Sequence, residues 1–111
     1  MTRYVFQLDV REGSEQRLRE LNDQYEPALR RATGAIEGFG GLEKYILGDR
    51  YVELIDLEGD FGEFGRQLAA DPEVREFLRS VNDCFVQPLR ELGERRMDLV
   101  QRVEDGRSQA A

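Results

Sequence analysis

The sequence contains no histidine or tryptophan and only one cysteine and one lysine among its 111 residues. Without histidine, the chain cannot build His-ligated zinc or haem sites, nor Ser–His or Cys–His catalysis. A single cysteine, Cys84, excludes an intramolecular disulfide, and its place on an apolar helix stripe suggests an inert core thiol. Because no calcium-loop spacing appears either, we expect no metal and no cofactor.

Long apolar runs are also missing. No run approaches the roughly 18 residues that a membrane-spanning helix needs, and the first ten residues alternate rather than form the apolar centre of a signal peptide. Acidic residues outnumber basic ones by 23 to 16, for a net charge of −7, so a nucleic-acid backbone would be repelled. We therefore expect a cytoplasmic protein with neither a membrane nor a nucleic acid as its partner.

Hydrophobic residues (40%) and charged residues (35%) occur in the proportions of a globular chain. A chain of this length can bury about two thirds of its surface, which is enough for one core. We expect one domain at residues 1–103 and a flexible polar tail at 104–111. Lys44 is the only lysine, so the other basic residues are all arginine. This bias fits either bidentate pairing with carboxylates or a GC-rich coding genome.

The first half of the domain carries clear periodic patterns. Residues 3–10 alternate and predict a half-buried strand, and the apolar spacing over 14–33 predicts a helix. Pro27 should kink that helix and Gly34 should end it. A glycine-rich segment, 35–47, predicts a bulged strand rather than a phosphate-binding loop, because the phosphate-loop motif is absent.

The next segments predict a hairpin and two helices. Gly48-Asp49 should turn the chain into a central strand at 50–57, which carries apolar residues on both faces and should be covered on both. Asp60 should cap a short helix, with Glu63 completing a capping box. Asp71 and Pro72 should open a longer helix.

The apolar stripe of that longer helix continues to Leu92, with Pro88 expected to kink or end it. Residues 95–103 predict a last strand. The order strand–helix–strand–strand–helix–strand predicts an α+β, ferredoxin-like split βαβ antiparallel sheet with helices on one face. A second copy is the simplest cover for the other face, giving a homodimer that forms a dimeric α/β barrel.

Two groups of residues could carry chemistry. Glu53 lies in an apolar strand, where a buried carboxyl group has a raised pKa and can act as an acid or base. The alternative is a structural strand residue, either exposed at the rim or salt-bridged to Arg3, Arg50 or Arg102. Aromatic side chains suit either a pocket for a flat, oxygenated ligand or ordinary core packing. The candidates for ligand binding are Tyr4, Phe6, Tyr25, Phe39, Tyr45 and Phe77.

Three segments, residues 48–52, 56–60 and 68–75, resemble the SchA/CurD-like family of aromatic-polyketide biosynthesis proteins. Residues 82–88 are similar to the segment that follows in that family. The order of elements over about 4–92 also looks like the tetracenomycin-type polyketide cyclases, which are dimeric ferredoxin-like proteins.

The resemblance implies a polyketide cyclase, or a cyclase-like accessory protein, acting on a small-molecule polyketide intermediate that is free or bound to a carrier protein. The reaction would be an aldol-type ring closure with dehydration, aided by the folding of the chain in an apolar cavity. Glu53 would assist enolisation, and Arg50 or Tyr51 would polarise a carbonyl. The alternatives are a cofactor-free monooxygenase on the same fold and a non-catalytic binding module of a synthase complex.

Overall fold

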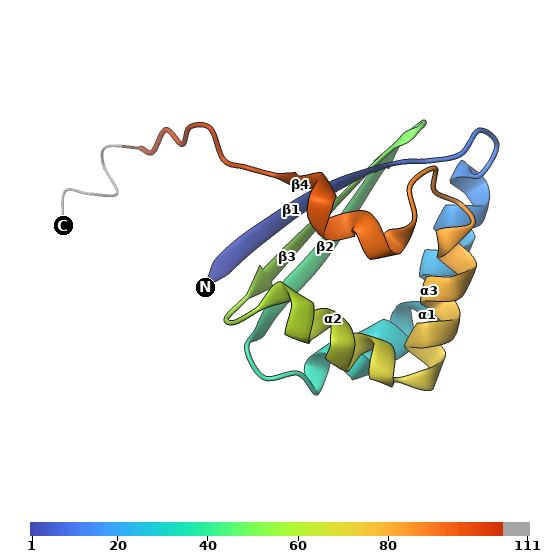
Figure 1. The fold of residues 1–111 in the computed structure, drawn as a ribbon, viewed down its shortest axis with the longest axis horizontal. Helices are drawn as coiled ribbons and strands as arrows, with labels where there is room; N and C mark the ends of the chain where they lie inside the picture. Colours follow the sequence, from blue (N-terminus) through green and yellow to red (C-terminus); the bar gives the residue numbers. More distant parts are fainter. Residues whose placement is uncertain (106–111) are drawn as a thin grey trace.

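The computed structural model, which describes residues 1–105, contains an antiparallel sheet of four strands in the order β2-β3-β1-β4 (Figure 1). The strands are β1 (Thr2–Asp9), β2 (Phe39–Leu47), β3 (Arg50–Leu57) and β4 (Arg96–Met97). Every strand pair is antiparallel. The predicted ferredoxin-like α+β fold is confirmed.

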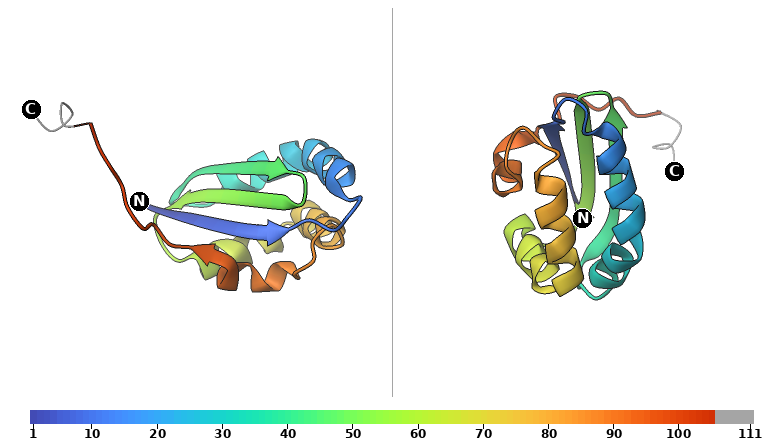
Figure 2. Two further views of the ribbon diagram at one scale, coloured as in Figure 1. Left: turned by 90° about the horizontal axis from the view of Figure 1, so that it is seen from above. Right: turned by 90° about the vertical axis from the view of Figure 1, so that its right-hand side faces the viewer.

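The helices are α1 (Glu15–Gly34), α2 (Phe61–Ala70), α3 (Pro72–Asn82) and the short 3₁₀ helix η1 (Leu89–Arg95). They lie on one side of the sheet, and Figure 2 shows the strands without a helix in front of them on the other side. The expectation that β3 is covered on both faces is therefore met on only one face within a single chain. No described helix combines the length and apolarity needed to cross a bilayer.

The β2–β3 hairpin sets the register of the site. Gly48 adopts a positive φ of 59°, which glycine tolerates best, and the chain reverses at Gly48-Asp49 as predicted. With this turn, Lys44 lies opposite Glu53. The predicted bulge is also present, as a register shift between Phe39 and Gly41. Because side chains alternate along a strand, Lys44 and Glu53 share the face that the helices cover.

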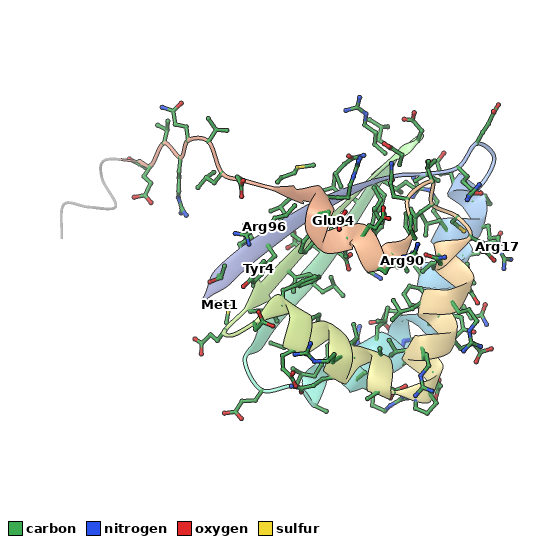
Figure 3. The ribbon with its side chains drawn as sticks, viewed as in Figure 1. Met1, Tyr4, Arg17, Arg90, Glu94 and Arg96 are labelled. Atoms are coloured by element: carbon green, nitrogen blue, oxygen red, sulfur yellow. The ribbon has the colours of Figure 1, made fainter. Side chains whose placement is uncertain are left out.

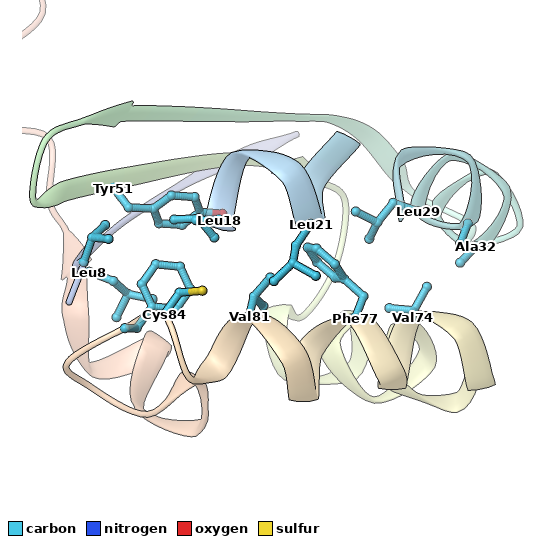
Figure 4. Packing of buried hydrophobic residues seen from close by; sticks show 13 residues of the cluster. Leu8, Leu18, Leu21, Leu29, Ala32, Tyr51, Val74, Phe77, Val81 and Cys84 are labelled. Carbon is cyan, nitrogen blue, oxygen red and sulfur yellow. The ribbon is translucent and has the colours of Figure 1, made fainter. Parts of the chain in front are cut away.

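Helix α1 is one element of 20 residues that runs through Pro27, and Gly34 is its last residue. Ser14 occupies the cap position without a side-chain cap bond. The apolar stripe faces α3, and Figure 4 shows Leu21 of α1 meeting Phe77 and Val81 of α3. This contact fixes α1 over the sheet.

The end of α3 corrects the sequence prediction. The apolar stripe continues to Leu92, but the helix ends at Asn82 and a turn follows. Cys84 and Phe85 are buried in that turn, since Phe85 forms a bridge with Val10. Residues buried in this turn therefore follow the spacing of a helix stripe without being helical. The expected place of Cys84 in the core is confirmed, and burial raises the pKa of its thiol.

The predicted last strand at 95–103 is also wrong in length. Only Arg96 and Met97 pair with β1, and the chain then leaves the body of the domain (Figure 1). The apolar residues of this segment are mostly exposed, Val100 at 97%. These residues alternate as in a strand, but among the described residues of this segment only Arg96 and Met97 have a neighbouring strand to pair with. Of the predicted tail at 104–111, residues 106–111 lie outside the described part of the chain.

Two aspartates cap the second and third helices. Asp60 accepts a hydrogen bond from the Glu63 backbone N–H at 2.9 Å, which confirms the α2 cap. The capping box is not reciprocal, because the Glu63 carboxylate pairs with Arg66 at 2.7 Å instead. At α3, the Asp71 carboxylate accepts from the N–H groups of Glu73 and Val74 at 3.0 and 3.1 Å, as predicted for a helix with Pro72 in its first turn.

Asp71→Ala should lower the midpoint of thermal unfolding by about 4–8 °C, the shift expected when a domain of this size loses one helix cap. The substitution removes both cap bonds and the 2.8 Å contact between the Asp71 carboxylate and Arg31. Asp71→Asn keeps an acceptor for the cap but loses the charge, so its midpoint should fall between the two. A midpoint unchanged in Asp71→Ala would show that the cap does not stabilise α3.

Candidate functional site

The chain's only lysine lies inside the fold. Lys44 projects from β2 towards the helices, and its Nζ atom donates a hydrogen bond to Asn22 Oδ1 of α1 at 2.7 Å. The same Nζ lies 4.7 Å from the centroid of the Phe77 ring. Within residues 1–105 it has no carboxylate oxygen within 4.0 Å. Its nearest acidic neighbour is its cross-strand partner, Glu53, which acts on it through space.

Burial shifts the pKa of both partners towards the neutral form. Desolvation lowers the pKa of Lys44 from its ordinary 10.5, and the charge of Glu53 offsets part of that shift. Desolvation raises the pKa of Glu53 from its ordinary 4.5, while Lys44 and a hydrogen bond from Tyr51 act in the opposite direction. Burial also raises the pKa of Tyr51 well above 10.0, so its hydroxyl stays protonated. The three groups can therefore donate or accept protons in one small volume.

Two hollows meet at these residues. A groove of about 590 Å³ lies between α1 and β2, and an inner cavity of about 350 Å³ lies between the sheet and α2, α3 and η1. Lys44, Asn22 and Tyr51 line both, together with three leucines, and Glu53 lines the inner cavity. Lys44 and Glu53 therefore keep some exposed surface although they lie deep in the domain.

The inner cavity is otherwise mostly apolar. Aromatic and aliphatic side chains from α2, α3 and η1 form its far wall, with Phe61, Phe64, Leu68, Phe77, Val81 and Leu92 among them. Arg90 of η1 also lines it, in the region between η1 and α3 seen in Figure 3, and makes no hydrogen bond or ion pair within the described chain. An apolar cavity with a few polar groups at one place is the usual form of a small-molecule site.

Of the predicted catalytic residues, Glu53 and Tyr51 come together and Arg50 does not. Arg50 alternates with Tyr51 along β3, so it points to the opposite face of the sheet and lines neither hollow. The arginines considered as partners of Glu53 also lie elsewhere. Arg3 pairs with Asp56 at 2.9 Å, and Arg102 pairs with Glu104 at 3.1 Å.

Three of the predicted ligand-binding residues line the hollows. Phe39 and Tyr45 border the groove, and Phe77 borders the inner cavity. Tyr45 is 56% exposed, and its hydroxyl donates to the Glu43 carboxylate at 2.7 Å.

The other three lie in the core or at its edge. Phe6 is buried, and Tyr4 stacks beside it, with the guanidinium of Arg96 5.1 Å from the Tyr4 ring centroid (Figure 3). Tyr25 packs behind Phe77, with ring centroids 5.4 Å apart. These three aromatic residues shape the walls without lining either hollow.

Sequence reasoning missed Lys44 and Asn22. The signal for Lys44 was present, because a two-residue turn at Gly48-Asp49 places residue 44 opposite residue 53 on the same face. Glu53 is the one acidic residue on that face of the strands, so the sequence could have indicated that Lys44 lies opposite it. Asn22 has no comparable signal, since a polar residue beside an apolar helix stripe is ordinary.

No three His, Cys, Asp or Glu side chains among residues 1–105 gather as a metal site would require. The arrangement that the structure does provide is an amine, a carboxyl group and a phenol at the wall of an apolar cavity. Such a set can move protons and donate hydrogen bonds to a carbonyl oxygen.

The chain is a ferredoxin-like α+β protein with a cavity between its sheet and helices. No family model matches the sequence, and none of the curated proteins does. The structure does resemble solved structures. One is the tetracenomycin F2 cyclase from Streptomyces glaucescens, a type-II polyketide cyclase, with a TM-score of 0.65 and 15% identity over 95% of this chain and 99% of that one.

Two other solved structures share the fold. A putative antibiotic biosynthesis monooxygenase from Bordetella bronchiseptica has a TM-score of 0.57 and 21% identity over 78% of this chain and 86% of that one. The L-rhamnose mutarotase from Formosa agariphila has a TM-score of 0.65 and 18% identity over 94% of this chain and 100% of that one. At these identities the likeness establishes the fold, which proteins of different activities share.

Proposed function

We propose that the chain is a polyketide cyclase that promotes aldol-type ring closure of an aromatic polyketide intermediate. The observation that carries this proposal is the facing pair of Lys44 and Glu53 at the wall of an apolar cavity, with the Tyr51 hydroxyl beside them. The fold shared with a type-II polyketide cyclase supports it.

In the proposed reaction, the Glu53 carboxylate removes a proton from a carbon between two carbonyl groups. The ammonium of Lys44 and the hydroxyl of Tyr51 donate hydrogen bonds to the enolate oxygen that forms. The enolate carbon then bonds to a second carbonyl carbon of the same chain, and the resulting alkoxide takes a proton from the Glu53 carboxylic acid. Loss of water from the ring completes the aldol condensation and leaves the protein unchanged.

The cavity walls supply the remaining part of the catalysis. Apolar side chains around Phe77 favour a folded substrate and exclude water, which raises the local concentration of one carbonyl group near another. Arg90, free of partners within the described chain, can bind an acidic group of the intermediate. The groove between α1 and β2 would admit a substrate attached to a carrier protein.

A plot of the rate of ring closure against pH should be bell-shaped. Its acidic limb should lie at higher pH, and its alkaline limb at lower pH, than an ordinary carboxyl group and an ordinary lysine would give. Activity should rise with pH as Glu53 ionises, at a pKa above 4.5 because burial disfavours the carboxylate. It should fall as Lys44 loses its proton, at a pKa below 10.5 because burial disfavours the ammonium. A pH series of kcat/KM measures both limbs, and limbs at the ordinary values would contradict the placement of the pair.

The test of the function is product profiling of an aromatic-polyketide gene cluster with and without this chain, followed by turnover of the affected intermediate by the purified protein. A cyclase changes the ring pattern and consumes no oxygen. Oxygen uptake with an anthrone-like substrate would instead identify the cofactor-free monooxygenase, the activity suggested by the name of the Bordetella protein that shares the fold. A chain that captures a synthase partner but turns nothing over would be a binding module.

We also propose that the protein acts in the cytoplasm as a homodimer through the sheet face that the helices leave open. That face carries the exposed side chains of Tyr45 and Leu47, with Val52 and Leu54 half-buried beside them. These apolar side chains, which share the face with the Arg3–Asp56 ion pair, are best covered by a second copy across a two-fold axis. Light scattering at micromolar concentration should give the mass of a dimer, and a compact monomer would contradict this proposal.

A further inference from the structure

We propose that Lys44 is a nucleophile that forms a Schiff base with a ketone group of a 1,3-dicarbonyl ligand bound where the groove and the inner cavity meet. The proposal rests on the proposed function for its choice of ligand. Its test needs no turnover, so the two can fail separately.

In this inference the neutral amine of Lys44 takes the place of the ammonium donor described above, and the surroundings of Nζ raise the share of that neutral form. A lysine ammonium has three protons to donate, and the described residues offer it one hydrogen-bond acceptor, Asn22 Oδ1, and the face of the Phe77 ring. Among residues 1–105, no carboxylate oxygen lies within 4.0 Å of it. The amide and the ring therefore replace only part of the water shell that the ammonium loses on burial.

The amine is also accessible to a ligand. Lys44 lines both the groove of about 590 Å³ and the inner cavity of about 350 Å³, so a carbonyl compound can approach Nζ from either side. Asn22 holds the amine in place from α1, and Tyr51 lines the same two hollows. A nucleophile that is fixed, desolvated and open to a cavity is the arrangement found in amine catalysis.

Glu53 lies opposite Lys44, where the reaction needs a group that can donate and accept a proton. The neutral Nζ adds to the ketone carbon, and the proton that the nitrogen must then lose passes to the carbonyl oxygen, giving a neutral carbinolamine. The Glu53 carboxylic acid then gives its proton to the departing hydroxyl group, so that water leaves and a C=N bond forms as an iminium ion. The Glu53 carboxylate next removes a proton from the neighbouring carbon, which yields an enamine. The enamine carbon then bonds to a second carbonyl carbon, and the alkoxide that forms takes the proton back from the Glu53 carboxylic acid. Water hydrolyses the remaining C=N bond, which restores the ketone and releases the amine of Lys44.

The experiment uses acetylacetone, a small 1,3-diketone whose adduct with an amine is a conjugated enaminone that absorbs in the near ultraviolet. Intact mass should show a gain of one diketone less one water per chain, and peptide mapping should place it on Lys44. The chain's α-amine provides an internal reference.

We expect acetylacetone at pH 7 to modify Lys44 as well as the α-amine. Lys44→Met should lose the adduct at residue 44 and keep only the adduct on the α-amine, and Glu53→Gln should form the Lys44 adduct at least ten times more slowly. Peptide mapping of the unmodified protein decides the question even if a variant does not fold. Modification of the α-amine with Lys44 untouched would overturn the proposal, and so would equal adduct formation in Lys44→Met.

The outcomes separate this proposal from the cyclase function. Lys44→Arg keeps a cation that can polarise a carbonyl but cannot form a Schiff base. If Lys44 gives no adduct and Lys44→Arg still closes rings, the Schiff base is wrong and the cyclase stands. If Lys44 gives the adduct but no polyketide is cyclised, the cyclase is wrong and the reactive amine stands.

Discussion

Replacement of Glu53 by glutamine is expected to lower the rate of ring closure by about 10²–10⁴-fold, the range for loss of a general acid or base. The substitution keeps the shape of the side chain and its hydrogen bonding to Tyr51, but removes the group that transfers protons. The free energy of unfolding should stay unchanged or rise, because a carboxylate that costs energy to desolvate is gone.

If the role of Glu53 is only structural, the geometry leaves Lys44 as its partner. The arginines that the sequence suggested as salt-bridge partners do not reach Glu53. Arg3 pairs with Asp56, and Arg50 points to the other face of the sheet. Lys44 is the one basic residue opposite it. If the pair were only structural, Glu53→Gln would destabilise the protein and leave turnover per folded molecule unchanged.

A melt and an assay on the same preparation distinguish these results. Glu58→Gln is the matched control, because it makes the same change of acid to amide just beyond β3, at an exposed residue that lines neither hollow. It should alter neither turnover nor the unfolding midpoint. Loss of activity in both variants would point to the overall charge of the chain rather than to a group in the cavity.

The sequence predicted most of the fold because its strongest signals were local. Alternation in 3–10 and the hairpin at Gly48-Asp49 placed the central strands, and the cap residues Asp60 and Asp71 placed two helix starts. It failed after Asn82, where tertiary packing overrides pattern. There a turn buries Cys84 and Phe85 at helix-like spacing.

The candidate site was less predictable because it depends on which residues meet across elements. Alternation identified Glu53 and Tyr51 as sharing a face, and the same rule excludes Arg50 from it. Lys44 could have been found by counting back from the hairpin turn. Asn22 could not, because its hydrogen bond to Lys44 depends on how α1 lies over the sheet.

Replacement of Lys44 by methionine is expected to lower the rate of ring closure by at least 10²-fold, the loss expected when a donor that stabilises an oxyanion is removed. Methionine keeps the unbranched length of the side chain and fills the space between Asn22 and Phe77. The fold should therefore tolerate the change, and the unfolding midpoint should stay the same or rise, since a desolvated amine is lost. Lys44→Arg tests whether a cation alone is enough.

A change in pH dependence shows that the effect comes from the pair. Lys44 now lowers the pKa of Glu53 through its charge. In Lys44→Met that influence is gone, so the pKa of Glu53 should rise and the acidic limb of any remaining activity should move to higher pH. In Glu53→Gln the pKa of Lys44 loses the charge that raises it, so the alkaline limb should move to lower pH. Limbs that do not move would mean that the two groups titrate independently.

The double variant Lys44→Met with Glu53→Gln tests whether the two residues act together. When two residues serve the same step, removing both costs about as much activity as removing one. If both groups serve the same proton transfer, the double variant should be no more than slightly slower than the slower single variant. Losses that multiply would instead place Lys44 and Glu53 in separate steps. The stability of the variants is an independent test. The double variant removes both desolvated groups and leaves neither without its partner. It should therefore be more stable than either single variant.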